Sequence, residues 1–153
     1  MSNEPSTKNL HNSQTKFRRA ELSDLEEVVD LVHAVYKVHH NIYGIGFDSG
    51  SVVATCHHVI HNGICLLGHG AVAGGKIVPF LWNRKVLVGT VIFWGFLKPS
   101  GVRIIEAIAV EFQKRGAAHI NCASHFPDNS TGRFYERIGM HAAETQFVGE
   151  ISR

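Results

Sequence analysis

The chain has 153 residues, of which 44% are hydrophobic, and a formal net charge of +2. This length allows one domain with a substantial core and is too short for two ordinary ones. The weak net charge argues against binding to nucleic acid or an anionic membrane surface, and no apolar run is long enough for a membrane span or an export signal, so we expect a cytoplasmic protein.

The first elements are a tail, a short strand and a helix. Residues 1–15 are polar and poor in large apolar side chains, so we expect them to form a tail ahead of a single domain, residues 16–153. Residues 17–20 fit a short strand. Ser23 and Glu26 have the spacing of a capping box, and acidic residues fill the first helical turn. These signals predict a helix whose buried face carries Leu25, Val28, Val29, Val32 and Tyr36.

A second helix and a run of strands follow. The helix is predicted from Asp48 to Asn62, with Gly63 as a left-handed cap. Residues 64–97 are rich in β-branched and aromatic side chains, which predicts consecutive antiparallel strands. We place their boundaries at the Gly74-Gly75 pair and at Asn83-Arg84-Lys85. Within this run, Pro79 indicates an edge position or a bulge.

The last part of the chain alternates helices and strands. The loop KPSG, residues 98–101, leads into an amphipathic helix that is predicted to end at Gly116. The segment AHINCAS then reads as a strand, NSTGRFYERIG as a short helix ending at Gly139, and ETQFVGEI as a closing strand.

Cysteines and histidines set limits on redox and metal chemistry. The three cysteines are widely spaced and form no CxxC pair, which favours free thiols in a reducing compartment over disulfides. Of the eleven histidines, His57 and His61 lie one turn apart on the second predicted helix, next to His58. No third ligand and no HExxH motif accompany them, so we predict no native metal site.

The order of predicted elements is strand, helix, helix, antiparallel strands, helix, strand, helix, strand. In this order the chain resembles the GNAT superfamily of acetyl-CoA-dependent N-acetyltransferases over residues 16–151, and most closely the divergent members encoded by bacteriophages. The segments GAAHINCAS and RFYERIGMHAAETQFVGEI are similar to the family's strand, its helix with a "YE+LGF"-type ending and its closing strand. The resemblance implies an α/β fold with a mixed, mostly antiparallel twisted sheet flanked by about four helices.

The resemblance also implies where acetyl-CoA would bind. The family holds the cofactor pyrophosphate with a loop of the type Q/R-x-x-G-x-G/A between its fourth strand and third helix, whereas this chain has only KPSG there. The cofactor-binding candidates are Lys98 for charge, Ser100 as a helix cap, and the amides of Gly101, Val102 and Arg103. In the alternative, the loop is a tight turn with an N-cap and solvated basic groups.

The second half of the implied chemistry is proton transfer. In family members a tyrosine on the last helix commonly returns a proton to the thiolate, and Tyr135 has the matching position; on composition alone it is equally an aromatic core residue. The strand VGTVIFWGFL would offer its backbone to the pantetheine arm, with Trp94 as core filling and Gly95 marking a bulge. That strand lacks the carboxylate base common in the family. The remaining candidates for a base are His69, His119 and His125.

Two functions follow from these considerations. The first is an N-acetyltransferase that moves the acetyl group of acetyl-CoA to a small-molecule or protein amine, with Tyr135 as general acid. The second is a noncatalytic binding or structural protein of the same fold, such as a bacteriophage virion component with protein partners. Neither involves nucleic acid or membrane, and the fold alone does not decide between them.

Overall fold

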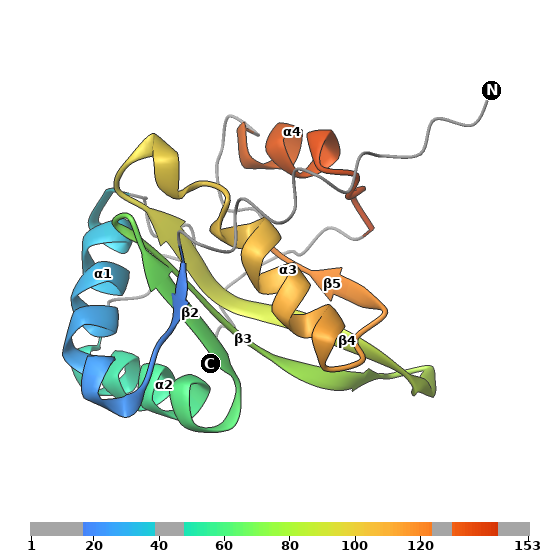
Figure 1. Cartoon of the computed structure of the whole chain (residues 1–153), viewed down its shortest axis with the longest axis horizontal. Coiled ribbons are helices and arrows are strands. Elements are labelled where there is room, and N and C mark those ends of the chain that lie inside the picture. Colours follow the sequence, from blue (N-terminus) through green and yellow to red (C-terminus); the bar gives the residue numbers. More distant parts are fainter. Residues whose placement is uncertain (1–16, 39–47, 124–129, 144–153) are drawn as a thin grey trace, which may run out of the picture.

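The computed structural model describes residues 17–38, 48–123 and 130–143. Within them a five-stranded sheet separates two layers of helices (Figure 1). The strands are β1 (Arg18–Arg19), β2 (Ile64–Gly68), β3 (Ala71–Phe80), β4 (Asn83–Phe96) and β5 (His119–Asn121). The α-helices are α1 (Leu25–Val38), α2 (Ser49–Asn62), α3 (Ile104–Lys114) and α4 (Ser130–Arg137). This architecture confirms the predicted α/β class.

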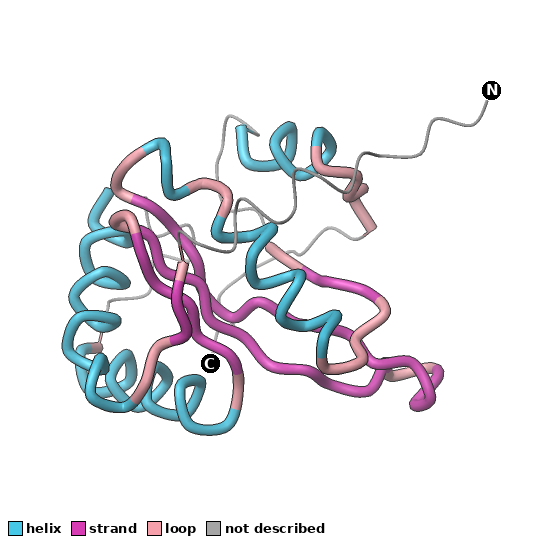
Figure 2. Tube along the Cα trace, in the orientation of Figure 1, coloured by secondary structure: helices cyan, strands magenta, loops and turns pink. Residues whose placement is uncertain are grey.

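The sheet is mixed and mostly antiparallel. Its strands lie in chain order from β1 to β5, and every neighbouring pair is antiparallel except β4 and β5, which are parallel. Figure 2 shows the strands in magenta and the helices in cyan on either side of them. The antiparallel pairs β2/β3 and β3/β4 need only short turns, whereas the parallel pair needs a long crossover, and α3 supplies it.

Each face of the sheet has its own apolar core. On one face, buried valines of α1 and α2 pack with Phe93 of β4 and Val72 of β3. On the other face, Ile108 and Phe112 of α3 pack with Ile64 of β2. Residues of both cores alternate along the strands, as the two-residue period of a strand requires.

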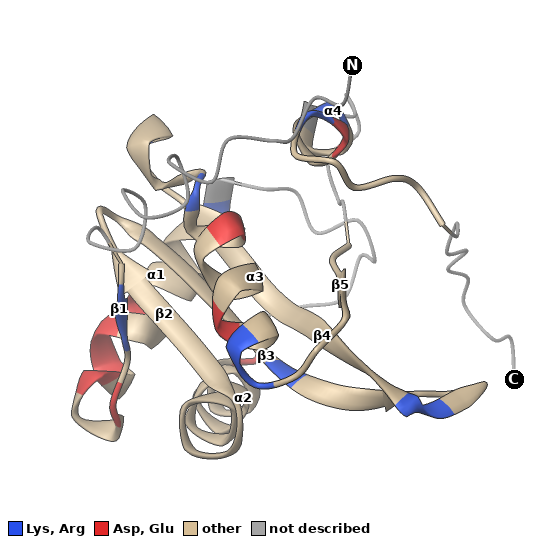
Figure 3. Ribbon diagram, turned by 45° about the vertical axis from the view of Figure 1, so that its right-hand side comes forward, with Lys and Arg blue, Asp and Glu red and all other residues tan. Residues whose placement is uncertain are grey.

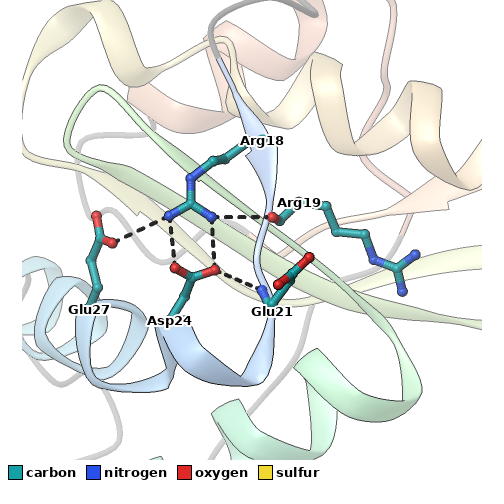
Figure 4. A network of polar contacts seen from close by, with 5 residues as sticks. All are labelled: Arg18, Arg19, Glu21, Asp24 and Glu27. Carbon is teal, nitrogen blue, oxygen red and sulfur yellow. Dashed lines mark hydrogen bonds and ion pairs between the residues drawn. The ribbon is translucent and has the colours of Figure 1, made fainter.

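The beginning of α1 differs from the prediction (Figure 4). A short 3₁₀ turn, Leu22–Asp24, precedes the helix, so the chain becomes helical earlier than expected. The Asp24 carboxylate accepts hydrogen bonds from the Glu21 amide at 2.8 Å and from both terminal nitrogens of Arg18 at 2.8 Å. The capping box predicted from Ser23 is therefore wrong. The bonds from Arg18 and Glu21 lower the pKa of Asp24 to about 2.

The buried face of α1 and the end of α2 correct two further expectations. Val35 is buried, whereas Tyr36 is 41% exposed, so Val35 completes the apolar stripe. The helix α2 begins within one residue of its predicted start, and Asp48 is its N-cap, with a side chain that accepts a hydrogen bond from the Ser51 amide. Gly63 has a φ of −125° and is not a left-handed cap. A side chain there would lie 2.3 Å from the Gly75 carbonyl oxygen, so this glycine permits close approach to β3.

The turn between β2 and β3 lies earlier than predicted. Gly68, His69 and Gly70 have positive φ values of 151°, 52° and 68°, and they form the turn. The Gly74-Gly75 pair lies inside β3 instead, since both residues are paired with β2 and β4. The expected irregularity at Pro79 is confirmed by a register shift between Pro79 and Phe80.

The later elements follow the predicted order. Gly116 and Gly139 have φ values of 91° and 90° just after α3 and α4, as predicted for glycines that end helices. The predicted tail, residues 1–15, and the predicted closing strand, residues 144–151, lie outside the described residues. Within the described parts of the chain, no helix is both long and apolar enough to cross a membrane.

Candidate cofactor site and active site

The central feature of the site is a β-bulge in β4 at Ile92. Phe93 is paired with Gly74 of β3, and Val91 is paired with Gly75, so Ile92 has no opposite residue. A side chain at position 74 would lie 2.3 Å from the Phe93 ring, which shows that the ring lies directly over this glycine. A bulge bends its strand and increases the local twist.

Our prediction placed the bulge at Gly95, and that position is wrong. Gly95 is paired in regular register with Val72 of β3. Its lack of a side chain has another cause: a Cβ there would lie 2.2 Å from Cγ1 of Val35 on α1. Gly95 therefore lets α1 approach β4 closely.

Beyond Thr90, one edge of β4 has no neighbouring strand in the described part of the chain. β5 pairs with β4 only from Val88 to Thr90, and the bulge at Ile92 follows directly. The strands therefore part at this point. The main chain from Val91 to Phe96 presents amide and carbonyl groups along an open edge, and such an edge can pair with an extended ligand that carries amide groups of its own.

Tyr135 of α4 lies over this half of β4. Its side chain is 7% exposed, and its hydroxyl donates a hydrogen bond to the Ala123 carbonyl oxygen at 3.0 Å. Burial, together with the neighbouring Cys122 thiol, raises the pKa of Tyr135 well above its usual value. The phenol is therefore neutral at physiological pH and keeps its proton for donation.

Aromatic side chains connect α4 to the open half of β4. The Trp94 ring centroid lies 5.9 Å from that of Tyr135, 6.1 Å from that of Phe96 and 6.4 Å from that of Phe134. Trp94 and Phe96 are partly buried against the core beneath α3. The indole of Trp94 is thus core filling, as predicted, while the backbone edge of the same strand stays unpaired within the described residues.

The KPSG loop forms a tight turn. Pro99–Gly101 is a single 3₁₀ turn in which the Gly101 amide donates to the Lys98 carbonyl at 2.8 Å and the Val102 amide donates to the Pro99 carbonyl at 3.3 Å. Both amides, which we predicted to face phosphates, are therefore engaged within the turn. A side chain at Gly101 would lie 2.7 Å from the Cβ of Ala71, so this glycine also has a packing role.

The N-terminus of α3 provides a different set of donors. Its N-cap residue is Arg103, with no side-chain cap, so the expectation that Ser100 caps this helix is wrong. Among the described residues, the amides of residues 103–106 have no hydrogen-bond acceptor, as is usual for a first helical turn. The Arg103 guanidinium is engaged by Glu106, with a distance of 2.7 Å between Nε and Oε2. Lys98 is exposed and takes part in no ion pair within the described residues.

The base candidates are widely separated. His69 lies in the β2–β3 turn with its ring centroid 6.1 Å from that of Phe17, and His119 is exposed on β5 opposite Val88. His125 lies outside the described residues. β4 has no carboxylate along its length. No base is therefore assigned by the geometry.

The described histidines and cysteines form no metal site and no disulfide. His57 and His61 stack on α2 with ring centroids 6.2 Å apart, but the described residues contain no group of three or more side chains arranged to hold a metal ion. The cysteines are free thiols, and burial raises the pKa of Cys56 to about 11 and those of Cys65 and Cys122 to about 12. The raised pKa values disfavour the thiolate form at all three positions.

Comparison with solved structures places the fold. A probable acetyltransferase superposes with a TM-score of 0.66 at 12% identity, over 90% of this chain and 99% of that one. The structure of AAC(6')-Iy in complex with the bisubstrate analog CoA-S-monomethyl-acetylneamine superposes with a TM-score of 0.63 at 12% identity. The match covers 90% of this chain and 97% of that one. This chain has the GNAT fold. No protein-family model and no curated protein matches it.

The GNAT fold does not by itself assign an activity. A transcriptional regulator from Bacillus halodurans C-125 is also similar, with a TM-score of 0.65 at 14% identity over 88% of this chain and 98% of that one. The roles of Tyr135 and of residues 98–103 remain predictions from the sequence. The sequence did not indicate the bulge at Ile92 or the amides of residues 104–106, whereas the Arg103 amide was among the predicted donors. The bulge is visible only in the pairing of β4 with Gly74 and Gly75 of β3.

Proposed function

We propose that the chain binds acetyl-CoA and transfers its acetyl group to a primary amine of a small molecule or a protein in the cytoplasm. One observation carries the proposal: β4 pairs with β5 only as far as Thr90 and bulges at Ile92, so that among the described residues its outer edge beside the buried Tyr135 has no partner strand. An extended chain with amide groups fits such an edge, and a neutral phenol is suited to hydrogen-bond a sulfur that develops negative charge.

The residues present fit the two halves of acetyl-CoA unequally. The main chain of residues 91–96 fits the amide-bearing pantetheine arm, because the edge of this segment that faces away from β3 pairs with no other strand in the described structure. The diphosphate would meet the amides of residues 103–106 with Lys98, and Arg103 would first have to leave Glu106. Exposed ion pairs of this kind contribute little stability, so Arg103 can exchange the Glu106 carboxylate for a diphosphate with little loss of free energy. When bound, the thioester supplies an activated acetyl group.

Tyr135 is assigned the general-acid role in this proposal. Its hydroxyl proton would be offered to the departing sulfur, and the Ala123 carbonyl now accepts that proton in a hydrogen bond at 3.0 Å. The acceptor amine must reach the site neutral, and its proton passes to solvent after attack on the carbonyl carbon. The proposal assigns no general base, since β4 carries no carboxylate.

Calorimetric titration of acetyl-CoA tests the proposal, with ATP as a control for nonspecific polyanion binding. We expect a one-to-one complex with a micromolar dissociation constant, on the order of −8 kcal/mol. Arg103→Gln should weaken binding roughly tenfold, because a charge-assisted contact is lost. The matched control is Lys114→Gln: Lys114 forms the same kind of pair, with Glu111, at the opposite end of α3. The absence of binding to folded protein would refute the proposal.

A noncatalytic protein of the same fold is the second candidate, and the loop geometry favours it. The Gly101 and Val102 amides are engaged, Gly101 is packed against Ala71, and Arg103 is paired with Glu106. Such a protein would have protein partners, for instance in a bacteriophage virion. The titration separates the two candidates: binding of acetyl-CoA supports the enzyme, and a folded protein that binds none supports the second candidate.

A further inference from the structure

The β3–β4 hairpin extends past the rest of the sheet as an arm (Figure 1). β2 pairs with β3 only up to Gly75, and β5 pairs with β4 only from Val88 onward. Between these limits the two strands of the hairpin pair with each other alone in the described structure. An isolated two-stranded ribbon is marginally stable in water, so this arm is suited to gain stability from a partner.

The tip of the arm is apolar and exposed. Phe80, Leu81 and Trp82 are consecutive, and they are 45%, 70% and 84% exposed. Turns are ordinarily polar, and three adjacent large apolar side chains at a hairpin tip form a surface of the kind that marks interaction sites. Tryptophan is also among the residues most enriched in the energetic centres of protein interfaces.

The tip also carries positive charge. Arg84 and Lys85 follow Trp82 directly, and both are exposed. Neither belongs to any ion pair found within the described residues. The tip therefore combines exposed apolar side chains with two adjacent cations. A complementary partner surface would be apolar and bordered by acidic side chains.

The opposite end of the molecule has such a surface. A hollow of about 630 Å³ lies between α1, the β2–β3 turn and the end of β4. Its apolar lining includes Leu31, Ala34 and Leu97, and its acidic lining is Asp24, Glu26, Glu27 and Asp30. This volume lies within the range of about 300–1,000 Å³ that accommodates a drug-sized group, so it has room for an indole ring.

Part of the acidic rim is free to meet a cation. Arg18 already pairs with Asp24 and Glu27. Glu26 and Asp30 are exposed and belong to no ion pair among the described residues. Figure 3 shows acidic positions in red near α1 and basic positions in blue near the tip of the β3–β4 hairpin, far from one another.

From these surfaces we infer that the hairpin tip of one molecule docks into the hollow beside α1 of a second copy. Trp82 enters the hollow, while Arg84 and Lys85 pair with Glu26 and Asp30. Because the two surfaces are different and lie at opposite ends, the contact is head-to-tail, and it builds chains or closed rings instead of two-fold dimers. This inference does not rest on the proposed acetyltransferase activity.

Sedimentation velocity over a range of protein concentrations tests the inference with the full chain. We expect association that grows with concentration and weakens at about 1 M salt, where the screening length falls to roughly 3 Å. Trp82→Ser should weaken association about thirtyfold or more, the size of a hot-spot loss. The double reversals Arg84→Glu/Lys85→Glu and Glu26→Lys/Asp30→Lys should each give monomers.

Mixing the two reversed variants provides the decisive measurement. An equimolar mixture should associate again, because each reversed surface complements the other variant. The control pair Arg115→Glu/Arg133→Glu, which changes the net charge equally at exposed sites outside both surfaces, should associate like the unmodified protein.

Three results would overturn the inference. The first is a protein that stays monomeric at every concentration. In the second, the Glu26→Lys/Asp30→Lys variant associates normally, which indicates contact between two tips. In the third, the tip binds vesicles of anionic phospholipid through Trp82 without any self-association, which indicates a membrane surface as the partner.

Discussion

Substitution of Gly89 by alanine tests how closely α3 approaches the sheet where β4 pairs with β5. Gly89 is paired with Ile77 on one side and with Ile120 on the other. A Cβ at this position would lie 2.2 Å from Cδ2 and 2.4 Å from Cγ of the Phe112 ring. Phe112 is 1% exposed, so the ring can give way only by displacing other core side chains or entering a void among them.

The expected cost follows from overpacking. Inserting a methyl group into a filled core lowers the unfolding free energy by about 1–3 kcal/mol. Replacing glycine also restricts the unfolded chain, which by itself raises the unfolding free energy by about 0.4–1 kcal/mol. Phe112→Ala alone should cost about 3–5 kcal/mol, because it leaves a cavity. In the double variant Gly89→Ala/Phe112→Ala the clash is absent. Its loss of unfolding free energy should therefore be about 1–3 kcal/mol smaller than the sum of the losses in the two single variants.

Urea unfolding followed by circular dichroism measures these free energies. The control is Gly50→Ala in the first turn of α2, where the nearest atom to a new Cβ is an Asp48 carboxylate oxygen at 3.5 Å. This change should stabilise the protein by about 0.4–1 kcal/mol. A Gly89→Ala variant as stable as the original, or a double variant whose cost equals the sum, would refute the placement of Phe112 against β4.

Further predictions concern charge, proton transfer and thiols. Arg18 and the Glu21 amide lower the pKa of Asp24 to about 2. The stability that ionised Asp24 contributes is therefore complete above its unfolded pKa near 3.9 and is lost as the pH falls toward 2. Asp24→Asn should remove this pH dependence from the unfolding free energy measured in urea. Tyr135→Phe should lower kcat for acetyl transfer while leaving acetyl-CoA affinity unchanged, since the hydroxyl acts only on the departing sulfur; unchanged turnover would exclude the role. The buried thiols of Cys56 and Cys65 should resist a disulfide reagent in the native protein at pH 8 and react after unfolding, and a fast native reaction of either would contradict its burial.

Local signals in the sequence were sufficient for the helices and less so for the strands. The apolar stripe of α1 and the Asp48 cap of α2 depend on residues a few positions apart, and both elements were predicted within a few residues. The glycines were harder to interpret. Gly63 and Gly74 make room for a carbonyl oxygen and an aromatic ring of distant segments, and neither forms a turn.

The candidate site shows the same limit. Tyr135 could be identified from its local motif, and the structure places it over β4. The bulge at Ile92 could not be identified from the sequence, because it arises only when β3 and β4 pair and β4 has one more residue than β3 in that stretch. The state of the KPSG amides depends on whether residues 99–101 form a 3₁₀ turn, and the choice between a phosphate loop and a turn was left open by the sequence.

The two halves of the proposed cofactor site make different demands on the chain. The open edge of β4 is built from main-chain groups, so any sequence that forms this bulge provides it. The phosphate end depends on particular side chains and amides, and there Arg103 is held by Glu106. Acetyl-pantetheine, which lacks the phosphates, therefore separates the two contributions. If it binds nearly as well as acetyl-CoA, the β4 edge dominates recognition; if it does not bind, the first turn of α3 is the recognition element.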